Sequence, residues 1–186
     1  MGAKTSNILT VNAGSSSVKL SLFSNYSSAD QNSDKPKSVV FDDISDISQI
    51  KHSISEWLDH LIQDNPVSAV GHRIVLGGPN HSSATRVTPE TIHELATYEN
   101  IDPEHLPLEL NLVKLIGHKL PDVIQIACFD TAFFNNIPSS ASILPLPKKY
   151  HSKELRRYGF HGLSYSYLQS EFKNIAGESA VNGRVI

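Results

Sequence analysis

The sequence predicts an α/β fold built on a mixed β-sheet, and three features support this prediction. Residues 8–11 and 18–23 are apolar β-type runs joined by a loop rich in Asn, Gly and Ser, which is typical of a β-hairpin. Residues 68–76 form a further apolar strand that runs into a glycine turn. Residues 123–129 are continuously apolar, as in the middle of a sheet that is covered on both faces.

The clearest helical pattern lies over residues 47–62, where apolar side chains recur at spacings of three, four, seven and eight. Asp46 or Ser45 is the expected N-cap, and Pro66 lies beyond the end. Because Trp57 belongs to the apolar stripe, we expect it in the core and not in a ligand site. Other expected elements are a strand at 38–41, helices at 89–97, 103–120 and 164–174, and a loop at 177–183.

Composition excludes several classes of protein. The 186 residues have a formal net charge of −3 and no Lys/Arg cluster, so a surface for nucleic acid or anionic membrane is unsupported. The single cysteine, Cys128, excludes an intramolecular disulfide and favours a reducing compartment. The chain shows no signal-peptide pattern and no apolar run of membrane-spanning length. We therefore expect a cytoplasmic protein with no nucleic-acid or membrane partner.

The hairpin loop at residues 12–19 is the first candidate for a binding site. It combines a glycine that turns freely, exposed amides, three hydroxyls and Lys19, and such a set can surround an anionic oxygen. It is not a Walker A loop, because the G-x-x-x-x-G-K-[ST] spacing is missing. On composition alone, a plain solvated turn is the simpler interpretation, and both remain open.

Arg73 is unusual because it lies with His72 inside an otherwise apolar strand. A guanidinium in such a place needs a partner, since burying an unpaired charge is costly. One interpretation is a structural salt bridge at the strand edge. The other is a guanidinium that binds the oxygens of a carboxylate or phosphate in a cleft, which the adjacent Gly77 and Gly78 would allow to approach closely.

Asp130 and His161 are the other two single residues that suggest chemistry. Asp130 follows the apolar run at 123–129, at the strand end where α/β proteins bind ligands and metals. It can equally serve as a cap for the next turn. Gly159 and Gly162 bracket Phe-His, which favours a tight loop that presents the imidazole of His161, although a loop histidine is often simply solvated.

Four motifs in this chain resemble those of the acetate and propionate kinase family. They are N-A-G-S-S-S-x-K at 12–19, G-H-R-[IV]-V-x-G-G at 71–78, F-D-T-A-F at 129–133 and R-R-Y-G-F-H-G at 156–162. They occur in the family's order and at comparable separations. The resemblance implies an actin/Hsp70/sugar-kinase-type fold, in which lobes built on a ribonuclease H-like sheet bind nucleotide between them. It also implies reversible phosphoryl transfer between ATP and acetate or a similar short acid, giving an acyl phosphate such as acetyl phosphate, with Mg²⁺.

The resemblance further implies roles for individual residues. Arg73 would orient the carboxylate and the transferring phosphoryl group, and His161 would stabilise that group in transit. Asp130 would be the carboxylate of the magnesium site, with Asn12 as a second candidate ligand, and would orient the attacking oxygen. Because a carboxylate nucleophile needs no general base, catalysis would rest on alignment and charge neutralisation. The remaining implied residues are Asn12, Ser15, Ser17 and Lys19 on the phosphate side of ATP, and Val75, Leu108 and Phe160 around the methyl end of the substrate.

The chain departs from the family pattern at several histidine positions. Leu76 stands where a histidine commonly follows G-H-R-V-V, and Phe134 where one follows F-D-T-A-F. The family's P-L-H-N-P segment, matched at residues 107–110, has Glu109 in place of the histidine. A glutamate would repel a phosphoryl group, and one missing donor costs roughly two to three orders of magnitude in rate. His105, just upstream, is a possible substitute.

Family members have a second lobe that carries the adenosine site, another arginine and a magnesium-site glutamate. We therefore interpret residues 1–186 as the N-terminal lobe of a divergent family member, inactive alone, with an exposed loop at 25–37 and the start of a second lobe at 184–186. The full-length form is expected to be a homodimer. Two alternatives stay open: a noncatalytic pseudokinase-type binding module, and a sugar kinase of the same fold, which the apolar pocket residues disfavour.

Overall fold

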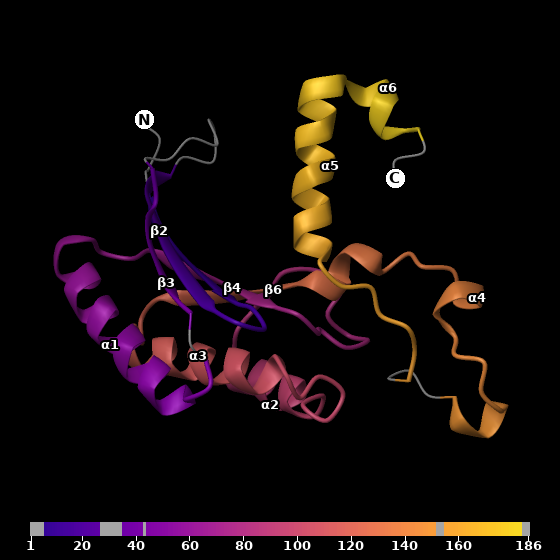
Figure 1. The fold of residues 1–186 in the computed structure, drawn as a ribbon, viewed down its shortest axis with the longest axis horizontal. Coiled ribbons are helices and arrows are strands. Elements are labelled where there is room, and N and C mark those ends of the chain that lie inside the picture. The colour runs from indigo at the N-terminus through magenta and orange to yellow at the C-terminus, as the bar shows by residue number, and fades with distance from the viewer. Residues whose placement is uncertain (1–5, 27–34, 43, 152–154, 184–186) are drawn as a thin grey trace. The chain divides into compact units, whose positions relative to one another are not determined.

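The structure is a computed structural model that describes residues 6–26, 35–42, 44–151 and 155–183 (Figure 1). The chain divides into two compact units. Unit 1 contains the residues up to Ile74 together with Ala84–Cys128, and unit 2 contains Val75–Ser83 together with the residues from Phe129 onward. The predicted start of a second lobe at 184–186 and the middle of the predicted loop, residues 27–34, lie outside the described residues.

A mixed β-sheet forms the framework of unit 1. Its strands are β1 (Ser6–Ala13), β2 (Val18–Tyr26), β3 (Lys37–Phe41), β4 (Ala69–Ile74), β5 (Thr85–Arg86) and β6 (Ile124–Phe129), in the spatial order β3-β2-β1-β4-β6-β5. The predicted hairpin is present, since β1 pairs antiparallel with β2, and β3 extends it on the other side of β2. β1 pairs in parallel with β4, so the predicted mixed sheet is confirmed.

Three helices pack on one face of this sheet: α1 (Ile47–Asp64), α2 (Pro89–Ala96) and α3 (Leu106–Lys119) (Figure 1). The predicted apolar stripe of α1 is buried, and Asp46 caps the helix by accepting from the N–H groups of Ser48 and Gln49 at 2.8 and 3.0 Å. Trp57 packs against the core, as expected. The buried cluster between α1, α3 and the strands consists of Leu9, Val11, Ala13, Val18, Leu20, Leu22, Ile50, Ile54, Leu58, Leu61, Val70, Leu108, Leu112 and Ile116.

Strand alternation separates the core side of the sheet from its polar side. In β1, Leu9, Val11 and Ala13 are buried against the helices, whereas Asn12 is exposed. Successive side chains of a strand point to opposite faces. Asn12 therefore lies on the face that α1 and α3 do not cover.

Unit 2 is made of short elements and one long helix. They are η1, a 3-10 helix (Asp130–Phe134), α4 (Ser139–Ser142), η2, a 3-10 helix (Lys148–Tyr150), α5 (Gly162–Ala176) and α6 (Glu178–Val181). No helix among the described residues of either unit is both long and apolar enough to cross a membrane.

Several predicted boundaries were wrong for local reasons. The predicted helix over 103–120 begins only at Leu106, because Pro107 belongs in a first helical turn. β2 continues to Tyr26 and β3 starts at Lys37, so the predicted loop at 25–37 overlaps both strand ends. The predicted loop at 177–183 contains α6.

The expectation that β6 is covered on both faces is also wrong. Ala127 and Phe129 are buried, but Ile124 is 46% exposed. Helices of unit 1 cover a single face of the sheet, so burial in β6 follows the two-residue period of its strand.

A buried histidine links β4 to β6. His72 is 2% exposed, and its Nε2 donates to Gln125 Oε1 at 2.6 Å. Burial lowers the pKa of His72 to about 4, with the hydrogen bond to Gln125 acting in the opposite direction. His72 is therefore neutral in the folded chain at pH 7.

We predict that the chain loses stability as the pH falls from about 6.5 toward 4. Over this range the unfolded chain takes up a proton on His72 and the folded chain does not, so up to about 3 kcal/mol of unfolding free energy is lost. Urea unfolding at a series of pH values measures this loss. The His72→Gln variant should show a flatter profile than the wild type, and an equally steep profile would contradict the assignment.

Candidate functional site

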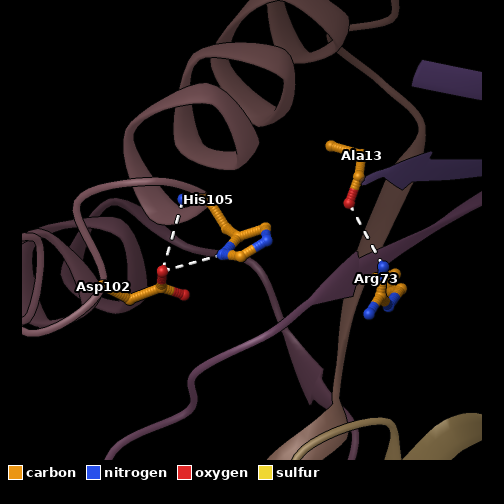
Figure 2. Close-up of polar contacts among 4 residues, drawn as sticks. All are labelled: Ala13, Arg73, Asp102 and His105. Carbon is orange, nitrogen blue, oxygen red and sulfur yellow. Dashed lines mark hydrogen bonds and ion pairs between the residues drawn. The ribbon is translucent and has the colours of Figure 1, made fainter. Parts of the chain in front are cut away.

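The polar end of unit 1 is set by the parallel pairing of β1 with β4. Val11 pairs with His72, so the next residues, Asn12 and Arg73, lie side by side near the ends of the two strands. Arg73 Nη1 donates to Asn12 Oδ1 at 3.1 Å and to the Ala13 carbonyl oxygen at 3.3 Å, the second of which is drawn in Figure 2. Both acceptors are neutral oxygens, and these bonds orient the guanidinium.

Lys19 joins this group through the hairpin. It pairs with Asn12 across the β1–β2 ladder, and both side chains are exposed. Residues that face each other across an antiparallel ladder have neighbouring side chains on the same face of the sheet. The structure therefore brings Asn12, Lys19 and Arg73 together at one end of unit 1.

The loop between β1 and β2 is a tight turn. Gly14 N–H donates to the Ser17 carbonyl oxygen at 2.8 Å, Ser15 is exposed and Ser17 is half-buried. This geometry suits a plain solvated turn and also leaves the Ser15 hydroxyl accessible to an anion. Phosphate binding by Ser15 and Ser17 stays a prediction.

In unit 2, Asp130 is tied to the start of α5. It is 1% exposed, and its Oδ1 accepts from the N–H of Leu163 at 3.3 Å. The predicted capping of the next turn is wrong, because η1 has no side-chain cap and Asp130 accepts from the first turn of α5, which is distant in the sequence. The contact also places Asp130 close to His161, two residues before Leu163.

The two glycines beside His161 serve close packing. A Cβ at Gly162 would collide with the Asp130 carbonyl oxygen and the Phe133 side chain, and a Cβ at Gly159 would collide with the ring of Phe134. His161 itself takes the left-handed conformation, with φ of 59°, and is exposed at the N-terminus of α5. The strained turn of the loop therefore lies at the histidine and not at its neighbours.

The predicted substrate-pocket residues have different surroundings. Leu108 is a core residue of unit 1, in the cluster with Leu112 and Ile116. Val75 is buried in unit 2, and Phe160 is 46% exposed there. The predicted site residues thus divide between the units, with Asn12, Ser15, Ser17, Lys19, Arg73 and Leu108 in unit 1 and Val75, Asp130, Phe160 and His161 in unit 2.

The turn before α3 contains a pair of which the sequence indicated only His105, as a possible substitute. His105 Nδ1 lies 2.9 Å from Asp102 Oδ1, just before the helix begins (Figure 2). Glu109, in the first turn of α3, is 2% exposed. Residues 103–107 read Pro-Glu-His-Leu-Pro and keep both prolines and the histidine of P-L-H-N-P, which the register at 107–110 does not. The matching spacing of these three residues is the sequence signal that identifies His105 as the histidine of this motif.

Asp130 is the one carboxylate here that the family roles connect to a metal. Among the described residues, no group of three or more His, Cys, Asp or Glu side chains can hold a metal ion. Mg²⁺ is commonly held by one or two carboxylates together with waters and phosphate oxygens. Asp130 fits such a site only if phosphate or further protein ligands complete it.

Comparison with known proteins establishes the family. Residues 7–186 match the profile of the Acetokinase family. The chain belongs to this family. Acetate kinase of Rhodopseudomonas palustris (strain TIE-1) is 38% identical over 130 residues, which is 70% of this chain and 33% of the relative. Acetate kinase of Rickettsia akari (strain Hartford) is 34% identical over 188 residues, which is 92% of this chain and 49% of the relative.

The fold class predicted from the four motifs is confirmed as well. The crystal structure of Porphyromonas gingivalis acetate kinase is 28% identical, with a TM-score of 0.70 over 92% of this chain and 49% of that protein. This acetokinase-family chain therefore has the mixed α/β architecture of actin-like kinases, and it spans between a third and a half of the length of these relatives.

We predict that Gly162→Ala destabilises unit 2, because the added Cβ meets the Asp130 carbonyl oxygen, which is backbone and has no free rotation. Overpacking of this kind typically costs about 1 to 3 kcal/mol. Gly71→Ala is the matched control, since a Cβ at that position meets nothing within 4 Å. Urea unfolding followed by circular dichroism compares the two variants, and equal stability of both would refute the close approach at Gly162.

Proposed function

We propose that this chain is the part of a short-chain carboxylate kinase that binds the carboxylate and the transferring phosphoryl group. The reaction is reversible phosphoryl transfer between ATP and acetate or a similar short acid. The supporting observation is the Arg73 guanidinium, held by Asn12 and Ala13 beside Lys19, in a chain of the Acetokinase family whose relatives are acetate kinases.

In this reaction a carboxylate oxygen forms a bond to the γ-phosphorus while the bond from phosphorus to the ADP oxygen breaks. The carboxylate nucleophile carries no proton, so the protein needs to align the reactants and compensate charge on the phosphoryl oxygens. Arg73 matches a carboxylate and a phosphoryl group with its planar fork. Lys19, with Ser15 and Ser17, provides a positive charge and hydroxyl donors for the phosphates of ATP.

Unit 2 contributes Asp130 and His161 to the same proposal. Asp130 would hold Mg²⁺, and the ion when bound would neutralise phosphate charge. His161 is exposed and offers a ring N–H donor to the phosphoryl group. Val75 and Phe160 are the candidates in unit 2 for the apolar wall around the methyl end of the acid, and Leu108 lies in the core of unit 1.

His105 stands at the histidine position of P-L-H-N-P when that motif is matched to residues 103–107. In the register of residues 103–107, the histidine is retained and Glu109 falls in α3. Glu109 is buried in the first turn of that helix, where the N-terminal end of the helix favours a negative charge. The retained histidine removes one ground for expecting an inactive protein.

A noncatalytic binding module remains the second candidate, because two histidine positions serve packing here. Leu76 is fully buried, and the Phe134 ring lies against Gly159 and edge-on to Phe133. Neither side chain can donate a hydrogen bond. Such a module would bind a carboxylate or nucleotide and transfer no phosphoryl group.

We further propose that the activity requires the second half that the relatives contain. Helix α5 buries only Gly162 and contacts η1 at its start and α6 at its end. Tyr165, Leu168, Phe172 and Ile175 recur at helical spacings along one stripe, and their exposed fractions run from 37% to 83%. An apolar helical stripe of this length is normally buried against another part of the protein or a partner. Because acetate kinases of about twice this length match the chain, their second half is the cover we propose.

We predict that the chain joined to the second half of Rickettsia akari acetate kinase forms acyl phosphate from ATP, Mg²⁺ and acetate, propionate or butyrate, and that the chain alone does not. Arg73→Leu should lower the rate of the joined protein by about 10²- to 10³-fold, since it removes the main charge at the reacting group. Arg86→Leu, at an exposed arginine of β5, is the control and should change it less than about 2-fold. A folded joined protein with no turnover on any of the three acids would overturn the proposed activity.

We predict that the α5 stripe becomes inaccessible in the joined protein. Ile175→Cys should react with a maleimide at least about 10-fold more slowly there than in the chain alone, because its thiol is then buried. Ser166→Cys, nine residues before Ile175 and so on the opposite side of the same helix, is exposed in the chain and should react at similar rates in both. Fast labelling of residue 175 in the joined protein would contradict this cover for α5.

A further inference from the structure

Asp102 and His105 form a closed pair in the turn that leads into α3. Asp102 Oδ1 accepts from His105 Nδ1 at 2.9 Å and from the backbone N–H of His105 at 3.3 Å. The two side chains are 12% and 24% exposed. The other oxygen, Asp102 Oδ2, is shut off from solvent and has no hydrogen-bond partner among the residues that the structure describes. His105 is therefore the group that compensates this carboxylate.

Backbone bonds fix the position of both residues independently of their side chains. The Tyr98 carbonyl oxygen accepts from Ile101 N–H at 2.8 Å and from Asp102 N–H at 3.2 Å. The Asp102 carbonyl oxygen accepts from Leu106 N–H at 3.3 Å. Since the turn is held in this way, the contact between Asp102 and the ring determines how the imidazole is oriented and not where the chain runs.

The carboxylate also determines which ring nitrogen carries a proton. An ionised carboxylate only accepts hydrogen bonds, so Nδ1 must be the donor in this contact. Nε2 is then the nitrogen on the other edge of the ring. Figure 2 shows that edge turned away from Asp102, on the side where Arg73 and Ala13 are drawn. In the doubly protonated ring, Nδ1–H donates to Asp102 and Nε2–H is available to an anionic oxygen.

We propose that Asp102 is a positioning residue, which holds Nδ1–H of the His105 ring so that the Nε2 edge is directed at the transferring phosphoryl group, to which a doubly protonated ring would donate from Nε2. This role rests on the proposed kinase function and adds to it a residue that none of the four motifs contains. A carboxylate behind an imidazole commonly fixes its orientation and tautomer, and its loss costs about 10- to 100-fold in related arrangements.

The competing explanation is that Asp102 only shapes the turn, because it also accepts from the backbone N–H of His105. Two variants separate the two roles. Asp102→Asn keeps an acceptor oxygen but no charge, and Asp102→Ala removes both. Asp59→Asn, which breaks the exposed ion pair with Lys119, is the control for the loss of an aspartate elsewhere in unit 1.

The first measurement uses the chain alone and does not depend on activity. In ¹⁵N-labelled chain, the ring shifts of neutral His105 report which nitrogen is protonated. We expect the Nδ1–H form to dominate in the wild type, in Asp102→Asn and in Asp59→Asn, and the Nε2–H form to dominate in Asp102→Ala. A wild-type ring in the Nε2–H form would overturn the proposal.

The second measurement uses the joined protein described above. Asp102→Asn and Asp102→Ala should lower kcat by about 10- to 100-fold and change KM for the carboxylate less than about 2-fold. In a His105→Gln background, Asp102→Ala should cause no further loss, because the ring that Asp102 orients is gone. An equal loss in both backgrounds would assign Asp102 a structural role alone. Inactivity of the wild-type joined protein would refute the proposed function, while the ring shifts would still decide the orientation of His105.

Discussion

The parallel hydrogen bonding of β1 to β4 determines both the core and the polar end of unit 1. Because Val11 pairs with His72, Leu9, Val11 and Val70 are buried under α1 and α3 in the same register that sets Asn12 beside Arg73. A slip of one residue would turn the apolar set outward and Arg73 inward. A guanidinium in the core without a partner is costly, so the register that satisfies the core also selects the position of the arginine.

In unit 2, close packing of the backbone determines how Asp130 and His161 are placed. The backbone of Gly162 lies so close to Asp130 that no other side chain fits, and the first turn of α5 then gives Asp130 the N–H of Leu163. The same close packing forces the turn onto His161, which takes a left-handed conformation and is exposed. The motif R-R-Y-G-F-H-G is therefore explained by packing first, and the presentation of the imidazole is a consequence of it.

The sequence predicted what depends on local pattern and missed what depends on distant contacts. The hairpin, α1 and its Asp46 cap follow from spacing within one segment, and all three are present. The partners of Arg73 lie some 60 positions away in the chain, and the residues next to Arg73 do not indicate which they are. The single-sided burial of β6 depends on which face the helices cover. Asp102 is an exception, because it lies only three residues before His105 and was missed for lack of a motif and not for distance.

The missing histidines do not by themselves exclude phosphoryl transfer at a site whose charged groups are well oriented. Donors that are fixed before the reaction stabilise charge on a phosphoryl group without reorganisation, although each missing donor costs roughly two to three orders of magnitude in rate. In unit 1 each candidate donor is held by a different means, Arg73 by the oxygens of Asn12 and Ala13, Lys19 by its ladder position and His105 by a carboxylate. Leu76 and Phe134 remove possible donors but also pack the segments around them. Loss of donors at these positions is therefore compatible with transfer, provided that His105 and Arg73 keep the orientations that their oxygen partners give them.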